Sequence, residues 1–402
     1  MKQNIPFFLP DISQVEIDNV VEVLKSDWIT TGSKTKEFER KISDYCGTNK
    51  TICLNSATAA LEMCLRMLGV GPGDEVITSA YTFTASASVI DHVGAKIVLV
   101  DTEKDSYYMS VTELEKAITP KTKAVIPVDI AGVMCDYDWI FEVIENKKKL
   151  FEANNNVQAK FGRIVVLADA AHSFGATYKD QMSGSVADFT AFSFHAVKNL
   201  TTAEGGALIW KSIDEDFDQY IYGIINTLSL HGQTKDAFSK NQLGAWEYDI
   251  VAPAYKCNMT DIQAAIGLGQ LANYAEKLKK RRYIVNKYIE GFSDILMIDP
   301  LVHYNEKGHS SGHLFLMRLK DQDEVGRNNF IHKLAECGIT ANVHYKPLPL
   351  LTAYKNIGFK MESYPNSYNQ YKNEVTLPLY TRLSKEDVNY IIKMCKEACD
   401  FI

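Results

Sequence analysis

Two ionisable side chains follow buried strands, and their chemistry is complementary. Lys198 lies in a turn of AFSFHAVKNLTTAEGGALIW, between two apolar runs that predict buried strands. Burial lowers the proton affinity of a lysine and makes its amine a nucleophile suited to Schiff-base formation. Asp169 ends another apolar run, IVVLAD, with His172 nearby, where a carboxylate suits a cationic ring nitrogen. Taken singly, such a lysine is more often solvated, and such an aspartate is often a helix cap.

A third segment could hold an anion. TICLNSATAAL predicts a strand, a turn and the start of a helix, whose free N–H groups favour a phosphate. Ser56 and Thr58 add hydroxyl donors, and a simple N-cap at Asn55 or Ser56 is the alternative. No GxxxxGK[ST] motif occurs here, which disfavours a nucleoside-triphosphate loop. Phe83 follows the next strand, where its ring could stack on a planar cofactor or pack in the core.

The elements that would position these residues alternate between strand and helix. Seven apolar runs predict strands, namely TICL, EVITS, KIVLVD, KAVIPVD, RIVVLAD, FTAFSF and GALIW. This alternation predicts a mainly parallel sheet covered by helices on both faces. Ligands of such sheets collect at the carboxyl ends of the strands. The residues that fall there are Ala57, Phe83, Asp169 and Lys198.

The C-terminal part of the chain predicts a smaller unit. A long helix is followed by a strand in HLFLMRL, an edge strand in ITANVHYKP and a last helix capped by Ser384. We therefore predict an α/β fold in two domains. An N-terminal arm and a large domain would span residues 1–260, and a smaller α+β domain would span residues 261–402.

The motifs and their order resemble a known family. SFHAVKNLTTAEGGAL is similar to the signature of the DegT/DnrJ/EryC1/StrS nucleotide-sugar aminotransferases, which are fold-type I enzymes dependent on pyridoxal 5′-phosphate (PLP). The resemblance runs from PFFLP to the last helix. It implies PLP held as a Schiff base on Lys198, Asp169 at its ring nitrogen and His172 at its phenolic oxygen. The other cofactor-binding positions that it implies are Ser56, Ala57, Thr58, Ser193 and, stacked on the ring, Phe83.

The resemblance also implies substrates and an assembly. The amino group of L-glutamate would pass to the keto carbon of a nucleotide-linked sugar, and the motifs look closest to enzymes that aminate C4 of UDP-sugars for surface glycans such as lipopolysaccharide. Asn258 would reach the cofactor phosphate of a second chain, so the resemblance implies a homodimer with shared sites. The substrate-facing positions that it implies are Thr30, Thr31, Gly32, His344 and Tyr345.

Several alternatives remain open. The acceptor could be a 3-keto dTDP-sugar, or the protein could be a cofactor-binding regulator without turnover. A family dehydratase is disfavoured, because those relatives replace the Schiff-base lysine with histidine. An ordinary helix connection at WITTGS and a surface strand at ITANVHYKP are the alternatives to a substrate pocket.

The chain departs from the family pattern in three places. Asp129 stands in VDIAG where many relatives have histidine, and Ser33 stands where proline is usual. Residues 138–161 are longer and more polar than a plain crossover and predict a helix with an exposed loop around residues 154–156. HGQTKDAFSKNQLGAWEYDIV predicts a surface flap.

Composition and residue spacing narrow the partners, the location and the metal content that we expect of the protein. A net charge of −7 without a basic block argues against nucleic acid as a partner. No secretory leader or membrane span is evident, so we expect a cytoplasmic protein. Eight scattered cysteines without a CxxC predict reduced core residues. His309 and His313 have metal-pair spacing, but the Ser-Ser-Gly between them breaks a helix, so we expect no metal.

Overall fold

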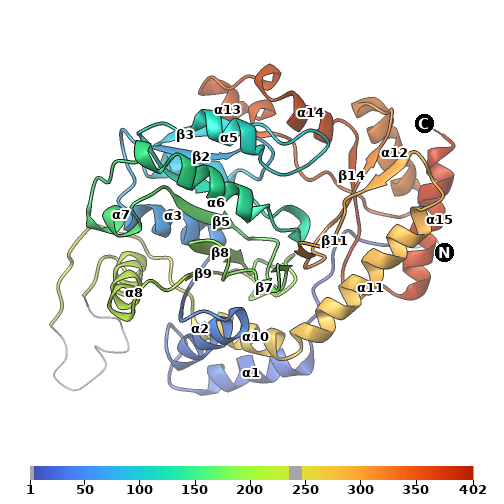
Figure 1. Ribbon diagram of the computed structural model, residues 1–402. Coiled ribbons are helices and arrows are strands. Elements are labelled where there is room, and N and C mark those ends of the chain that lie inside the picture. Colours follow the sequence, from blue (N-terminus) through green and yellow to red (C-terminus); the bar gives the residue numbers. More distant parts are fainter. Residues whose placement is uncertain (1–3, 235–246, 402) are drawn as a thin grey trace.

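A seven-stranded sheet forms the centre of the computed structural model, which describes residues 4–234 and 247–401 (Figure 1). Its strand order is β1-β9-β8-β5-β4-β2-β3. The seven predicted strands are all present, and the α/β prediction is confirmed. Their bounds are β1 (Lys50–Leu54), β2 (Glu75–Ser79), β3 (Lys96–Val100), β4 (Thr122–Ile126), β5 (Val165–Asp169), β8 (Phe189–Ser193) and β9 (Gly206–Trp210).

All but one of these strands run parallel. Strands β3, β2, β4, β5 and β8 pair in parallel, whereas β9 is antiparallel to both β8 and β1. The connection between β8 and β9, residues 194–205, contains no helix that could carry the chain back across the sheet. The strand must therefore return in the opposite direction, and the Lys198 turn lies at the carboxyl end of β8.

Alternating side chains of the strands enter two separate cores. Leu167 of β5 packs with helices α3 (Ala57–Met67), α4 (Ala85–His92) and α8 (Glu215–Ser229) on one face of the sheet. Its neighbour Val166 packs on the other face with α2 (Ser33–Cys46), α5 (Val111–Ala117) and α6 (Tyr137–Asn146). Figure 1 shows the strands between these helical layers. Burial on both faces explains the nearly continuous apolar strand sequences.

Helix α11 (Tyr274–Phe292) leads from the large sheet to the C-terminal region (Figure 1). There β10 (Ile298–Pro300), β13 (Phe315–Leu319) and β14 (Glu374–Leu377) form an antiparallel sheet with α12 (Glu324–Glu336) and α15 (Lys385–Cys399) beside it. Ser384 caps α15 in a capping box, as the sequence predicts. The N-terminal arm joins this region through a bridge between Ile5 and Ile339.

The remaining elements complete the connections. A small sheet contains β11 (Tyr304–Asn305), β12 (Gly308–His309), β6 (Thr177–Tyr178) and β7 (Gln181–Met182). The remaining α-helices of the described chain are α1 (Gln14–Lys25), α7 (Asn156–Phe161), α10 (Asp261–Ala272), α13 (Thr352–Asn356) and α14 (Pro365–Tyr371). Helix α10 packs against both α1 and α2.

One local expectation was wrong. ITANVHYKP forms no strand, because only isolated bridges at Ile339 and Asn342 connect it to neighbouring backbone. The helix and loop expected within residues 138–161 are present as α6 and the mostly exposed residues 151–155, and Asn155 caps α7, which begins at the next residue. All eight cysteines are free thiols. Residues 235–246 of the predicted flap lie outside the described residues.

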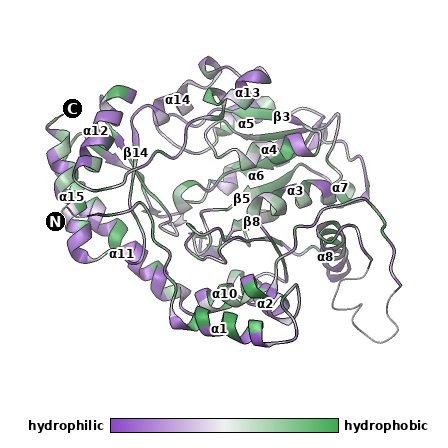
Figure 2. Cartoon of the chain, turned by 180° about the vertical axis from the view of Figure 1, so that it is seen from behind, coloured by the Kyte–Doolittle hydropathy of each residue, from purple (hydrophilic) through white to green (hydrophobic). Residues whose placement is uncertain are grey.

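Helix α1 presents apolar side chains to solvent. Val23 is buried against the protein, whereas Val15 and Leu24 are 44% and 58% exposed. Ile17 and Val21 of the same helix are also exposed. Figure 2 shows apolar segments along α1 at the edge of the molecule. Within the described part of the chain, no helix combines the length and apolar character that crossing a bilayer requires.

Candidate active site

A cavity of about 450 Å³ opens at the carboxyl ends of the central strands. Its walls come from the start of α3, the loop after β2, the ends of β5 and β8, and the C-terminal segment around residue 344. The structure brings together here ten residues that the sequence singled out, namely Ser56, Ala57, Thr58, Phe83, Asp169, His172, Ser193, Lys198, His344 and Tyr345.

Lys198 and Asp169 form the charged centre of this cavity. Burial lowers the pKa of Lys198 to about 8, although the nearby charge of Asp169 opposes that shift. Burial also raises the pKa of Asp169, although Ser86, the Ala171 N–H and Lys198 all favour its anion. The Ser86 hydroxyl donates to Asp169 Oδ2 at 2.6 Å, and the Ala171 N–H donates to Oδ1 at 3.2 Å. The site therefore holds an amine of lowered pKa close to a buried carboxyl.

His172 presents a defined donor to the cavity. Burial lowers its pKa well below the usual value, so the ring is neutral. The backbone N–H of Ala131 donates to His172 Nδ1 at 3.2 Å, which requires that Nδ1 be unprotonated. The proton therefore lies on Nε2, which is 3.2 Å from the hydroxyl oxygen of Tyr345. His172 can thus donate a hydrogen bond to an oxygen bound in the cavity.

The start of α3 forms a socket for an anion. Ser56 is the N-cap and accepts from the Ala59 N–H, so the cap predicted as an alternative function coexists with the socket. The first N–H groups, on Ala57 and Thr58, have no intrahelical acceptor. Gly206 of β9 packs directly behind this turn, because a Cβ at Gly206 would lie 2.3 Å from the carbonyl carbon of Ser56. The close packing holds the helix N-terminus at the cavity.

Phe83 and Tyr345 supply aromatic surface. The Phe83 side chain is 56% exposed, which is unusual for a large apolar residue, and its ring centroid is 5.7 Å from that of Tyr345. An exposed flat ring, a helix N-terminus, a buried carboxyl and a lysine of lowered pKa together fit a planar, phosphorylated aldehyde with a basic ring nitrogen. The residues present therefore fit PLP.

The other predicted positions lie elsewhere. The Asn258 side-chain amide donates to the Thr31 hydroxyl at 2.5 Å, and the Gly32 N–H donates to Asp261 at 2.8 Å. Thr30 joins the same cluster, because its carbonyl accepts from the Asp261 N–H at 3.1 Å. None of these residues lines the Lys198 cavity within the described chain. Thr260, two residues after Asn258, caps α10.

Asp129, which departs from the family pattern, is buried and is one of the residues that line the cavity. Its carboxyl accepts from the Cys135 N–H, the Tyr137 hydroxyl and the Ser173 hydroxyl at 2.7–3.0 Å. Burial raises its pKa to about 6 despite these donors, and the charge of Asp169 adds to the shift. The three donors show that an acid at this position is well accommodated.

Sequence reasoning missed several residues that organise the site. Ser86 contacts Asp169, but a serine in TASASV resembles ordinary helix text. Asn199 accepts from His313 at 3.0 Å and donates to the Ser311 carbonyl at 2.9 Å, which ties the Lys198 turn to the C-terminal region. His313 also packs its ring 4.4 Å from His172. These contacts join residues at least 83 positions apart in the sequence, so no local pattern indicates them.

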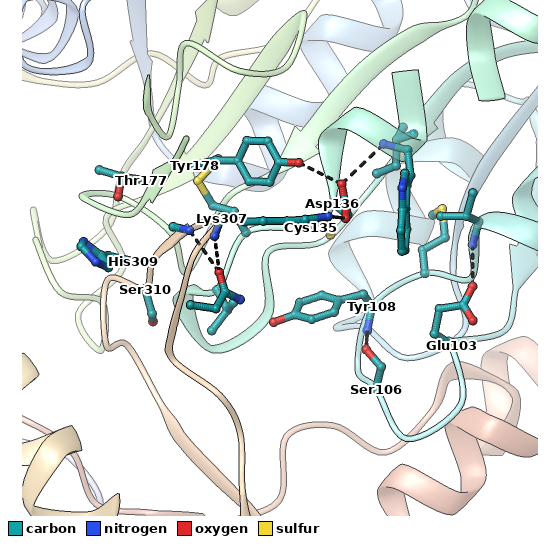
Figure 3. Close-up of a pocket in the computed structure, with 18 residues that line it drawn as sticks. Glu103, Ser106, Tyr108, Cys135, Asp136, Thr177, Tyr178, Lys307, His309 and Ser310 are labelled. Carbon is teal, nitrogen blue, oxygen red and sulfur yellow. Dashed lines mark hydrogen bonds and ion pairs between the residues drawn. The ribbon is translucent and has the colours of Figure 1, made fainter. Parts of the chain in front are cut away.

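A second cavity, of about 280 Å³, lies between α6 and the β6–β12 sheet (Figure 3). Asp136 pairs with Lys307 there and accepts from the Tyr178 hydroxyl at 2.8 Å. Its main polar groups are therefore already paired with one another. His309 lines this cavity, whereas His313 is buried near His172, so the two do not form a metal pair. In the described chain, no three His, Cys, Asp or Glu residues gather as a metal site would require.

The fold and the site together define one class of enzyme. A mainly parallel sheet, a lysine in the turn after one strand and an acid at the end of its neighbour are typical of fold-type I PLP-dependent enzymes. Residues 10–396 match the DegT/DnrJ/EryC1/StrS aminotransferase family, and the chain belongs to this family. It is a PLP-dependent aminotransferase.

Similar proteins extend over nearly the whole chain. The spore coat polysaccharide biosynthesis protein SpsC of Bacillus subtilis is 38% identical over 98% of this chain and 96% of its own length. The UDP-4-amino-4-deoxy-L-arabinose–oxoglutarate aminotransferase of Shewanella sediminis is 33% identical over 98% of this chain and 97% of its own. Spr1654 of Streptococcus pneumoniae, named as a sugar aminotransferase and solved in its PMP form, is 56% identical with a TM-score of 0.96 over 99% of this chain and 100% of its own.

Proposed function

We propose that this protein transfers the amino group of L-glutamate to C4 of a UDP-linked 4-keto-sugar, in the synthesis of an amino sugar for a surface polysaccharide. The observation that carries the proposal is the Lys198 amine, whose pKa burial lowers to about 8, in one cavity with Asp169 and the α3 N-terminus. Such an amine can form an imine with an aldehyde and later move a proton.

Each side chain has a role in this chemistry. When bound, PLP supplies an aromatic ring that withdraws electrons from the α-carbon of the amino donor. The carboxyl of Asp169 would hold a proton on the ring nitrogen of the cofactor, and Ser86 orients that carboxyl. Nε2–H of His172 would donate to an oxygen of the cofactor, because Nδ1 is occupied by the Ala131 N–H. The amine of Lys198 would serve as the base that accepts and returns the substrate proton.

The phosphate and the ring face are bound by separate elements. The N–H groups of Ala57 and Thr58 and the hydroxyls of Thr58 and Ser193 would hold the phosphate at the start of α3. Phe83 would cover one face of the ring. Two separate elements would thus hold the cofactor and orient it toward Lys198.

The relatives support the choice of substrates. The Shewanella relative is named for an amino sugar carried on UDP and for oxoglutarate, the keto acid that glutamate becomes. The Bacillus relative is named for polysaccharide biosynthesis. His344 and Tyr345 line the cavity from the C-terminal segment, where they would contact a bound sugar. A 3-keto dTDP-sugar is the competing acceptor.

We further propose a homodimer in which each chain completes the site of the other. Asn258, Thr31 and Gly32 form a hydrogen-bonded cluster separate from the chain's own cavity, as a contribution to a neighbouring site requires. The exposed apolar side chains of α1 supply a surface that a second chain would cover.

The test is a substrate panel with purified holoenzyme. Glutamate alone should bleach the yellow colour of the protein, and a UDP-4-keto-sugar should restore it with release of an amino sugar. Matched 3-keto and dTDP-linked sugars should react at least tenfold more slowly in kcat/KM. The Lys198→Ala variant is the control, and its colour should not respond to glutamate. A persistent colour under saturating glutamate contradicts the donor, and a preference for 3-keto or dTDP-linked sugars contradicts the acceptor.

A further inference from the structure

A fully buried carboxyl lies behind the substrate side of the cavity. Glu374 of β14 is 0% exposed, and its Oε2 accepts from the backbone N–H of His344 at 2.8 Å. Its Oε1 is 2.5 Å from the hydroxyl oxygen of Thr376, which is also 0% exposed. Burying a carboxyl away from water destabilises the fold unless other groups offset the cost, so the partners of Glu374 require an explanation.

The Thr376 hydroxyl connects this carboxyl to the imidazole of His344. Its oxygen lies 3.0 Å from His344 Nδ1. A hydroxyl has one proton, so Thr376 can donate either to Glu374 or to His344, but not to both. Burial lowers the pKa of His344 to about 3, so its ring is neutral and only one of its two nitrogens carries a proton.

These constraints allow two arrangements. With Glu374 ionised, Thr376 donates to Glu374, Nδ1–H of His344 donates to Thr376, and Nε2 is left as an acceptor. With Glu374 protonated, Oε1–H donates to Thr376, Thr376 donates to Nδ1, and Nε2 carries the proton. In both arrangements Oε2 still accepts from the His344 N–H.

We propose that Glu374 is a positioning residue for His344: the protonation state of its carboxyl, transmitted through Thr376, decides whether Nε2 of His344 accepts or donates a hydrogen bond in the cavity. His344 lines that cavity, and Nε2 is the ring nitrogen that Thr376 leaves available. As an acceptor, Nε2 would take a hydrogen bond from a hydroxyl group of the sugar. This role of His344 rests on the proposed function.

The groups that face the pair set which arrangement dominates. The charge of the buried Arg327 of α12 favours the ionised form of Glu374. Burial favours the protonated form, and the nearby hydroxyls of Tyr81 and Tyr107 are neutral groups that supply no positive charge to offset it. Burial raises the pKa of Glu374 to about 8. Around His344, the charge of Lys198 disfavours the cationic form of the imidazole. The Phe7 ring stacks on the His344 ring, with 5.5 Å between the two ring centroids. The two arrangements are therefore close enough in free energy to exchange near neutral pH.

The test reads the tautomer of His344 directly. Holoenzyme with ¹⁵N-labelled imidazoles is examined by long-range ¹H–¹⁵N correlation at about pH 6.5 and about pH 9.5, on either side of the Glu374 pKa. His344→Gln identifies the signals of His344. Wild-type protein should show Nε2–H at the lower pH and Nδ1–H at the higher pH. One unchanged tautomer at both values would overturn the proposal.

Variants separate the relay from general damage. Glu374→Gln should show Nε2–H at both pH values, because its amide NH₂ must face Thr376 while its oxygen accepts from the His344 N–H. Thr376→Val should abolish the pH response, and Thr376→Ser should restore it. A response that persists in Thr376→Val, or an Nδ1–H tautomer in Glu374→Gln, would refute the relay. The tautomer is measured without substrate, so the outcome does not depend on the identity of the sugar.

Kinetics supply a second readout. At about pH 9.5, Glu374→Gln should raise the KM for the sugar about tenfold, the loss of one hydrogen bond, with kcat changed by less than about twofold. Glu336→Gln, which removes an exposed carboxylate from the neighbouring α12, is the matched control and should leave both constants unchanged. A fall in kcat with an unchanged KM would contradict contact between Nε2 and the substrate.

Discussion

Replacing Asp169 with asparagine is expected to lower the pKa of the Lys198 ammonium group further. In the wild-type protein, burial lowers the Lys198 pKa to about 8, while the charge of Asp169 holds it up. At pH 7, one unit below that value, about 10% of the amine is neutral. A nearby opposite charge shifts a pKa by about one unit or more, so Asp169→Asn should bring the neutral fraction at pH 7 to about 50%.

The assay is competitive labelling of the apoprotein with an amine-reactive reagent across a pH series, followed by mass spectrometry of the Lys198 peptide. Labelling of Lys198 should reach half its maximum near pH 8 in the wild type and at lower pH in Asp169→Asn. Asp214→Asn removes an exposed carboxylate at the start of α8 and should leave the midpoint unchanged. A wild-type midpoint above about pH 10, or a midpoint that rises in Asp169→Asn, would refute this account of the site.

Three further predictions concern positions around the cavity. Ser86→Ala removes the hydrogen bond to the carboxylate at the end of β5 and should lower kcat about tenfold or more with little effect on KM, measured under saturating donor. Gly206→Ala drives a Cβ into the α3 turn and should cost about 1–3 kcal/mol in unfolding free energy and weaken cofactor retention, whereas Gly223→Ala, with open space around it, should do neither in calorimetry and cofactor titration. Asn258→Ala and Lys198→Ala are each expected to be inactive, and mixed dimers should regain activity; equal inactivity of the mixture would place Asn258 in its own chain's site.

Much of the fold follows from local sequence. The seven apolar runs correspond to the seven strands of the sheet, because strands buried on both faces need continuous apolar text. The residues that end those strands meet at one edge, because parallel strands share their direction. The edge strand expected in ITANVHYKP failed, because a strand needs a partner backbone that local sequence does not reveal.

The candidate site was also only partly predictable from the sequence. Its residue types and their convergence at one edge of the sheet were predictable from local sequence, and the resemblance supplied their roles. Ser86 behind Asp169, Asn199 bonded to His313, and Glu374 linked through Thr376 to His344 were not predictable. Each pair joins side chains whose own surroundings look ordinary in the sequence.

The sequence by itself determined the order of strands and helices, the two apolar faces of the sheet, and a lysine and an aspartate at neighbouring strand ends. The tertiary structure alone decided how strongly the Lys198 amine is deprotonated, which nitrogen of His172 carries its proton, and that Asn258 lies outside the cavity of its own chain. The reason is physical. The periodic pattern of buried residues can be recognised from residues that are neighbours in the sequence. The proton affinity of a side chain instead depends on desolvation and on charges that distant segments bring within a few ångströms.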